Sequence, residues 1–166
     1  MSGCEKSFTG NEKTMEIVAY EMKYVNAVDN ESAIVCIPIE LKFFEEYMRI
    51  YNECFYEMRK ELDIHPYHFL STYEQIAEKV NDIYLLVNED EIIGSVACYG
   101  NEIDDLIVNK SFQNKGYGKQ LLLWGMKHIR EKSNDPIVLH VAKWNDKALS
   151  LYQTAGFEIT KVEKVR

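Results

Sequence analysis

Residues 102–130 contain the feature that most restricts the fold of this chain: a strand-like run, a loop with two glycines, and then an apolar helical pattern. The run "EIDDLIV" (102–108) is followed closely by "FQNKGYGKQLLLWGMKHIR" (112–130). Glycine is a costly residue at the start of a helix unless something must approach the backbone. A helix entered in this way presents free N–H groups and the positive end of its dipole. The loop is therefore a candidate site for phosphate.

The hydrophobic pattern around this unit switches between strand and helix periods. Strands or extended segments are expected at 16–25, 33–39, 102–108, 137–142 and 157–165, and an antiparallel hairpin with an acidic turn at 88–91 is expected within 83–100. Helices are expected at 40–62, 72–81, 117–132 and 145–155. Asn145 suits the N-cap of the last helix and Gly156 its left-handed end. This order predicts a mixed α/β domain.

The length and composition are those of one ordinary domain. With 166 residues the chain can bury a sizeable core, and no apolar run approaches the roughly 18 residues of a membrane helix. Residues 1–14 lack the apolar core of a secretion signal, so we expect a flexible tail there and a single domain over 15–166. The four cysteines form no CxxC pair, and the four histidines show no zinc-ligand spacing against them. We therefore expect free thiols, no metal and a cytoplasmic location.

The charge is acidic overall but unevenly distributed. A net charge of −8 argues against nucleic acid as the partner, because phosphate binding needs a basic surface. Residues 74–105 carry nine acids and one lysine. Residues 110–132 carry six bases and one acid; the bases are Lys110, Lys115, Lys119, Lys127, Arg130 and Lys132. Such a run can be a solvated helix face, but this one begins at the glycine loop. Lys119 and Arg130, on one helical stripe, could neutralise phosphates.

Three phosphate-bearing ligands compete for the glycine loop. A nucleotide P-loop requires Ser or Thr after its lysine, whereas Gln120 follows Lys119. A dinucleotide fingerprint requires a third glycine in an early βαβ unit, whereas position 121 is Leu and the loop lies late in the chain. The third candidate is coenzyme A. The run "QNKGYG" (113–118) resembles the Gln/Arg-x-x-Gly-x-Gly/Ala signature of the Gcn5-related N-acetyltransferase (GNAT) superfamily.

A second run resembles the same superfamily. "NDKALSLYQTAGF" (145–157) fits its Asn-x-x-Ala-x-x-Leu-Tyr-x-x-x-Gly-Phe pattern. The matching positions are Asn145, Ala148, Leu151, Tyr152, Gly156 and Phe157. The resemblance spans about 83–162, and the sequence departs from many members at Lys110, where they have proline, and at Asn114, where they have glycine. It implies a mainly antiparallel central sheet flanked by helices, with 15–82 on the acceptor side and 83–166 as the acetyl-CoA-binding core.

The resemblance also implies a coenzyme site. The pyrophosphate would lie against the loop, and pantetheine would bond the exposed backbone of the strand before it. The residues so implied are Leu106, Ile107, Val108, Gln113, Asn114, Lys115, Gly116, Tyr117, Gly118, Lys119 and Asn145. An N–H group of that strand would polarise the thioester carbonyl, which would lower the activation barrier by roughly 3–4 kcal/mol.

The catalytic residues are implied in the same way. Tyr152 would protonate the departing thiolate, and Glu102 would take the proton of the amine, with Asp104 as the alternative base. By the period of two, Glu102 and Asp104 should share one strand face with Leu106 and Val108. The loop that carries His65, Tyr67 and His68 would border the acceptor pocket.

The resulting expectation is an acetyl-CoA-dependent N-acetyltransferase that acts by direct attack in a ternary complex. Cys98 lies in a predicted strand without a base partner, which argues against a covalent intermediate. The acceptor would be a small-molecule or peptide amine, and the acidic segment favours a cationic one. No nucleic acid or membrane partner is expected, and the resemblance implies a homodimer through the C-terminal strand. The alternative is an acyl-CoA-binding sensor without turnover.

Overall fold

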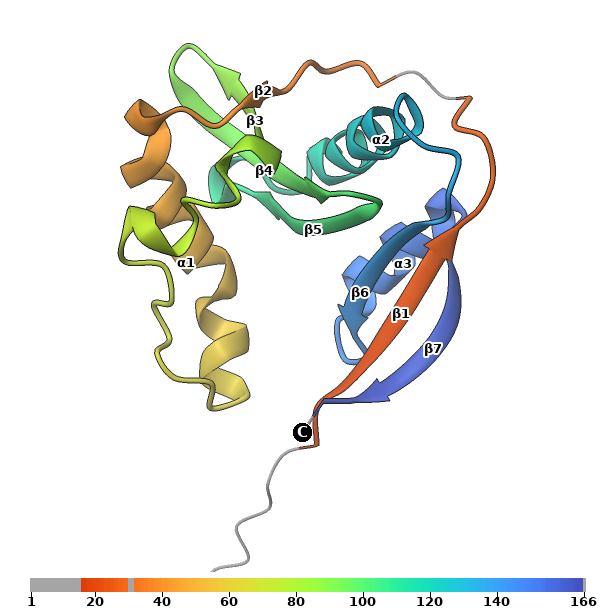
Figure 1. Ribbon diagram of the computed structural model, residues 1–166. Coiled ribbons are helices and arrows are strands. Elements are labelled where there is room, and N and C mark those ends of the chain that lie inside the picture. Colours follow the sequence, from red (N-terminus) through yellow and green to blue (C-terminus); the bar gives the residue numbers. More distant parts are fainter. Residues whose placement is uncertain (1–15, 30–31, 166) are drawn as a thin grey trace, which may run out of the picture.

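The protein forms a seven-stranded sheet with helices on both faces (Figure 1). A computed structural model describes residues 16–29 and 32–165, so the expected tail over 1–14 lies outside the described residues. The strands are β1 (Val18–Tyr24), β2 (Ile37–Pro38), β3 (Ile83–Asn88), β4 (Glu91–Tyr99), β5 (Glu102–Val108), β6 (Ile137–Ala142) and β7 (Glu158–Lys164). The helices are α1 (Phe44–Glu61), α2 (Tyr117–Arg130) and α3 (Asp146–Ala155). The predicted mixed α/β fold is confirmed.

The strand order is β2-β3-β4-β5-β6-β1-β7. Neighbouring strands are antiparallel except β5 and β6, which are parallel. The N-terminal strand β1 pairs with β6 on one side and β7 on the other. It therefore lies with the C-terminal half of the sheet, apart from the rest of segment 15–82 (Figure 1).

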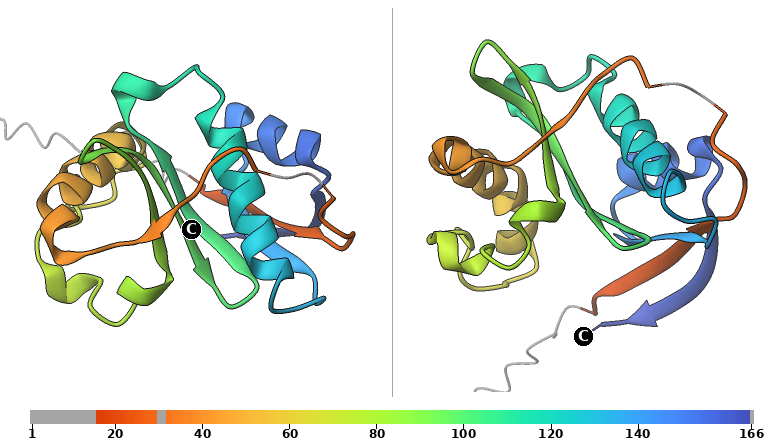
Figure 2. Two further views of the ribbon diagram at one scale, coloured as in Figure 1. Left: turned by 90° about the horizontal axis from the view of Figure 1, so that it is seen from above. Right: turned by 45° about the horizontal axis from the view of Figure 1, so that its top comes forward.

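Two clusters of buried side chains lie on opposite faces of the sheet. Helix α2, with α3 beside it, covers one face, where Leu121, Leu122 and Met126 pack against strand residues. Helix α1 covers the other face of the β2–β5 half, where Tyr47 and Ile50 are almost fully buried. The views in Figure 2 show α1 on one side of the strands and α2 on the other. The β2–β5 half is thus covered on both faces.

The predicted hairpin and helix ends agree with the structure. Strands β3 and β4 pair, and Glu89 and Asp90 in the turn have positive φ. The side chain of Asn145 accepts a hydrogen bond from the N–H of Ala148, and Gly156 ends α3 with a φ of 105°. Both ends of α3 are therefore built as the sequence predicts.

The predicted helix over 72–81 is wrong. Two 3-10 turns, Tyr73–Gln75 and Val80–Asp82, stand there, joined by a turn. Successive i→i+3 bonds, such as those from Ile76 to Tyr73 and from Lys79 to Ile76, replace the α-helical ones. A segment this short gains little from helix formation by itself, so the packing of its few apolar side chains decides its conformation.

Candidate active site

Strands β5 and β6 separate soon after they meet. Within the described chain their only ladder pair is Glu102 with Val138, at the start of both strands. The edge of β5 that faces β6 therefore has no strand partner further along. Leu106 and Val108 pack toward the α2 face, and Ile107 is buried on the α1 face. The three residues expected to bind pantetheine through their backbone thus lie along this open edge.

The glycine loop joins the end of β5 to the N-terminus of α2. Gly116 is the N-cap of α2 with a φ of 85°, and a Cβ atom added there would meet no atom within 4 Å. In the part of the chain that the structure describes, the N–H groups of Gly116, Tyr117 and Gly118 have no hydrogen-bond acceptor. Free donors, a positive helix end and open space fit the phosphates of coenzyme A.

Side chains around the loop fix its shape. The side chain of Gln113 donates to the carbonyl of Val108 at 3.1 Å, and Asn114 has a φ of 63°. Asparagine tolerates this left-handed conformation, so the departure from glycine at Asn114 is accommodated. Lys147 of α3 donates to the Asn114 side chain at 3.1 Å. Lys147 therefore brings a further positive charge to the loop, one that the sequence analysis did not assign.

Asn109 is a second residue that the sequence analysis missed. Its side chain is buried, with 3% of the residue exposed. The Nδ2 group donates to the carbonyl of Ile92 at 3.0 Å, and Oδ1 accepts from the N–H of Ser111. Asn109 thus fixes the start of the loop to β4. Only the three-dimensional pairing of β4 with β5 distinguishes it from any other loop asparagine.

Of the predicted phosphate-binding bases, Arg130 is at the wrong end of the helix. Its guanidinium donates to the carbonyls of Tyr24, Asn26, Ser133 and Asp135. It therefore fastens the C-terminal end of α2 to neighbouring segments, about 20 Å from the glycine loop by the rise of a helix. Lys115 and Lys119 lie at the N-terminal end, and Lys119 borders a hollow between α2 and α3 that Leu123 and Thr154 also line.

Tyr152 lies on α3 among side chains of the α2-side core. Its ring packs edge-on against Phe157 with 6.2 Å between ring centroids. Burial, and next to it the charge of Asp104, raises the pKa of the Tyr152 hydroxyl to about 12. The group keeps its proton at neutral pH. It can therefore donate a hydrogen bond to a developing thiolate, although it is a weaker acid than a free phenol.

A β-bulge in β5 overturns the predicted arrangement of its side chains. The register with β4 shifts between Ser95 and Ala97, and Asp105 on the opposite strand has a φ of 45°. The extra residue reverses the alternation. Ile103, Leu106 and Val108 pack on the α2 face. Glu102 pairs with Tyr99 and Asp104 with Ala97, and both partners belong to the α1-side core. Because paired residues point to the same face, Glu102 and Asp104 face the α1 side. The prediction that Glu102 and Asp104 share a face with Leu106 and Val108 is wrong.

The bulge places Asp105 among tyrosines on the α1 side. Burial, followed by the charge of Asp105, raises the pKa of the Tyr47, Tyr51 and Tyr99 hydroxyls. Burial and the charge of Asp104 raise the pKa of Asp105 itself to about 7, against a smaller opposite effect of Lys79. A half-buried carboxyl with this pKa can accept a proton near neutral pH. Nothing in the run "EIDDLIV" reveals the bulge, so sequence reasoning did not select Asp105.

Glu102, the predicted base, lies at the start of β5. Its carboxylate is 3.2 Å from Nδ1 of His140 on β6. His140 projects from the face opposite the α2-side core, since its neighbours Leu139 and Val141 are buried there. The carboxylate of Glu102 thus already has a partner on β6, the imidazole of His140.

The loop that carries His65, Tyr67 and His68 makes contacts within itself and with the last turns of α1. His65 Nε2 is 2.8 Å from an Asp63 oxygen, and the Tyr67 hydroxyl donates to the same carboxylate at 3.1 Å. The ring of His68 lies against that of Tyr56. These contacts place the loop at the C-terminal end of α1.

The family of the chain follows from comparison with known proteins. The model of the acetyltransferase (GNAT) family matches residues 44–157. This match spans both resembling motifs and more than half of the chain. The chain belongs to the GNAT acetyltransferase family.

Curated relatives match over shorter stretches. A mycothiol acetyltransferase of Thermobifida fusca (strain YX) is 31% identical over 81 residues, which are 49% of this chain and 23% of that protein. The uncharacterized N-acetyltransferase YvbK of Bacillus subtilis (strain 168) is 36% identical over 62 residues, 37% of this chain and 40% of that protein. The chain spans less than half the length of these relatives.

Solved structures share the fold. A GNAT-family acetyltransferase from Colwellia psychrerythraea has a TM-score of 0.66 at 12% identity, over 87% of this chain and 53% of that one. The protein PH1933 from Pyrococcus horikoshii OT3 has a TM-score of 0.62 at 22% identity, over 80% and 99%. No helix among the described residues is long and apolar enough to cross a membrane.

Proposed function

We propose that the protein is an acetyl-CoA-dependent N-acetyltransferase in which the amine attacks directly within a ternary complex. The observation that carries the proposal is the opening between β5 and β6. Around it lie the free N–H groups at the start of α2, the protonated hydroxyl of Tyr152, and the carboxyl of Asp105. Membership of the GNAT family supports the same activity. The coenzyme-binding residues and Tyr152 implied by the resemblance are retained in this proposal, whereas the base is assigned anew.

Acetyl-CoA supplies an acetyl group bound as a thioester, and the residues of the chain bind and orient it. The loop over 113–119 holds the phosphates, with Lys147 beside it, and Asn145 contacts the pantetheine arm. The open backbone edge of β5 at Leu106–Val108 holds the arm and polarises the carbonyl. Tyr152 donates a hydrogen bond where thiolate charge develops. We therefore place the leaving group on the α3 side of the opening.

The amine enters from the α1 side in this proposal. Asp105 is the base, because burial gives its carboxyl a pKa near neutrality. Glu102 is the alternative base, but its carboxylate already faces His140. The rings of Tyr51 and Tyr99 near Asp105 suit a cationic acceptor, and Lys79 already places its ammonium 5.4 Å from the Tyr99 ring centroid. We infer an acceptor amine that is positively charged in solution.

The proposal also retains a homodimer. Strand β7 is the outermost strand of the sheet, and its Ile159 and Val162 are exposed. Such an edge suits strand pairing with a second copy.

The experiment is continuous thiol release from acetyl-CoA with a panel of polyamines, amino acids, aminoglycosides, dipeptides and lysine peptides. We expect release above the no-amine rate with a cationic acceptor. Tyr152→Phe should lower kcat on the order of a hundredfold and leave acetyl-CoA affinity unchanged. Tyr73→Phe, at an exposed tyrosine, is the matched control. Acetyl-CoA binding without release across the panel would favour the sensor alternative, and full turnover by Tyr152→Phe would remove its assigned role.

A further inference from the structure

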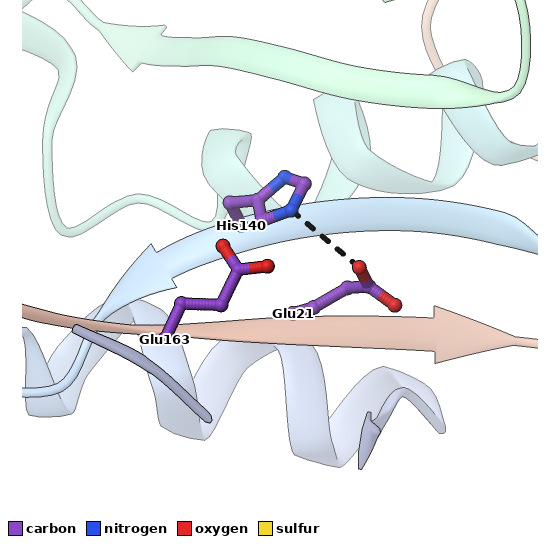
Figure 3. Close-up of side chains that lie close together, drawn as sticks. All are labelled: Glu21, His140 and Glu163. Carbon is purple, nitrogen blue, oxygen red and sulfur yellow. Dashed lines mark ion pairs between the residues drawn. The ribbon is translucent and has the colours of Figure 1, made fainter. Parts of the chain in front are cut away.

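Three strands bring a histidine and two glutamates together on the sheet face opposite the α2-side core. Glu21 of β1, His140 of β6 and Glu163 of β7 each offer one ligand atom, and these atoms lie within 4.8 Å of one another. Figure 3 shows the three side chains on the same side of the strands. We propose that they form a Zn²⁺ site that ties β1 to both of its neighbours.

The sheet register explains why these side chains meet. Glu21 is the ladder partner of His140, so the two side chains stand side by side. Glu163 pairs with Ala19, and Ala19 pairs with Ala142 on the other side. Because both alanines are small, the Glu163 side chain can extend over β1 toward His140. The spacing of histidines and cysteines predicted no metal site because two of these three residues are glutamates and all three lie far apart in the sequence.

The chemistry of the donors suits zinc. Zn²⁺ binds imidazole nitrogen and carboxylate oxygen at about 2.0–2.2 Å, in sites with three protein ligands and an open fourth position. The His140 Nε2 atom is 3.8 Å from Glu21 Oε2. Glutamate side chains are flexible, and movements of about 1 Å bring such atoms to the separation that a tetrahedral ion requires. An imidazole among the ligands favours Zn²⁺ over Mg²⁺ or Ca²⁺.

Glu102 gives the site the outer support that zinc-bound histidines use. Its carboxylate, 3.2 Å from His140 Nδ1, can accept the proton on that nitrogen. Nε2 is then left with its lone pair directed at the two glutamates. A carboxylate behind a histidine in this way orients the ring and increases its basicity toward a metal. Glu102 is a positioning residue in this proposal.

Nearby lysines only partly balance the carboxylates. Lys23 Nζ is 3.5 Å from Glu21, and Lys161 Nζ is 3.0 Å from Glu163. Together with Glu102, three carboxylates thus face two ammonium groups. Thr160 also donates to Glu21 Oε1 at 3.1 Å, so that oxygen is held and Oε2 is the one directed toward His140. A divalent cation is attracted by the remaining negative charge.

The test is Zn²⁺ titration of the full chain after chelator treatment, followed by calorimetry, and Co²⁺ titration followed by visible absorption. We expect one equivalent of Zn²⁺ to bind in the micromolar range or tighter and to raise the Tm. The Co²⁺ complex should show tetrahedral absorption without a near-ultraviolet thiolate band, because no cysteine is among the ligands. His140→Ala and Glu163→Gln should each weaken Zn²⁺ at least about tenfold.

Controls separate this site from other metal binding. His68→Ala removes a histidine outside the cluster and should bind Zn²⁺ as the wild type does. Glu102→Gln should weaken Zn²⁺ about tenfold while the Co²⁺ spectrum keeps its shape. Circular dichroism of the metal-free variants checks that each is folded. The proposal is overturned if no saturable binding is seen, if the Co²⁺ complex carries a thiolate band, or if both ligand variants bind like the wild type.

Discussion

At the N-terminus of α2 the protein offers backbone N–H groups to open space, whereas at the bulge of β5 it encloses a carboxyl among tyrosine rings. An added Cβ at Gly116 would touch nothing, while Asp105 is desolvated enough to raise its pKa to about 7. The first region presents backbone groups, and the second is defined by the environment of one side chain. In the proposed function the first binds coenzyme and the second handles the proton of the acceptor.

The glycine loop should be the most sensitive position for coenzyme binding. Gly116→Asp places a Cβ atom and a negative charge where phosphate is proposed to lie, so acetyl-CoA affinity should fall on the order of a hundredfold. Gly100→Asp is a matched control, because Gly100 also has a positive φ and open space around it. Calorimetric titration with acetyl-CoA measures both variants. Equal affinities would break the assignment of the loop.

A smaller effect concerns stability at Asp105. Its carboxyl has a pKa of about 7 in the folded protein but about 4 in an unfolded chain, so the folded state holds the proton more tightly. This contribution to stability is complete below about pH 4 and is lost as the pH rises through about 7. Asn cannot ionise, so Asp105→Asn should be more stable than the wild type at pH 8 by about 1–2 kcal/mol, allowing for partial hydration of the carboxylate.

Urea unfolding at pH 5 and pH 8 measures that difference, which should be larger at pH 8. Asp90→Asn is the control, because Asp90 also has a positive φ but lies in the β3–β4 turn. Asn tolerates this backbone conformation at both positions. A wild type that is as stable as Asp105→Asn at pH 8 would mean that the carboxylate carries no burial penalty.

The smallest effect is expected from Lys79. If Asp105 is the base, the rate should fall at low pH as this carboxyl takes up a proton. The charge of Lys79 lowers the pKa of Asp105, so Lys79→Gln should move this low-pH limb of the rate profile to higher pH by roughly a few tenths of a unit. Lys60→Gln is the control, since Lys60 also lies over a tyrosine ring, that of Tyr56, away from Asp105. Rate profiles of the two variants give the comparison. An unmoved limb in Lys79→Gln would show that the limb does not report Asp105.

The contrast between the glycine loop and the bulge of β5 explains which features the sequence could predict. Backbone recognition requires particular residue types at particular positions, such as Gly116 and Asn145, so it leaves motifs that can be read. The hairpin, the caps and the mixed sheet follow from equally local rules. The position of β1 between β6 and β7, and the guanidinium contacts of Arg130, depend on tertiary pairing that no local pattern encodes.

The base illustrates the limit most clearly. A strict period of two put Glu102 and Asp104 on the face of Leu106, and one extra residue at the bulge reversed that alternation. Burial raises the pKa of Asp105 first, and the charge of the adjacent Asp104 second; that burial exists only in the folded chain. The 3-10 turns over 73–82 likewise follow from packing rather than from helix propensity.

The pH dependence of kcat/KM for the wild type, Asp105→Asn and Glu102→Gln decides whether Asp105 is the base. Wild-type activity should fall below about pH 7, because the base must be deprotonated to accept the amine proton. Asp105→Asn should lose this limb together with about a hundredfold of activity, and Glu102→Gln should keep the limb. A limb that persists in Asp105→Asn, or that disappears only in Glu102→Gln, would contradict the assignment of Asp105 as the base.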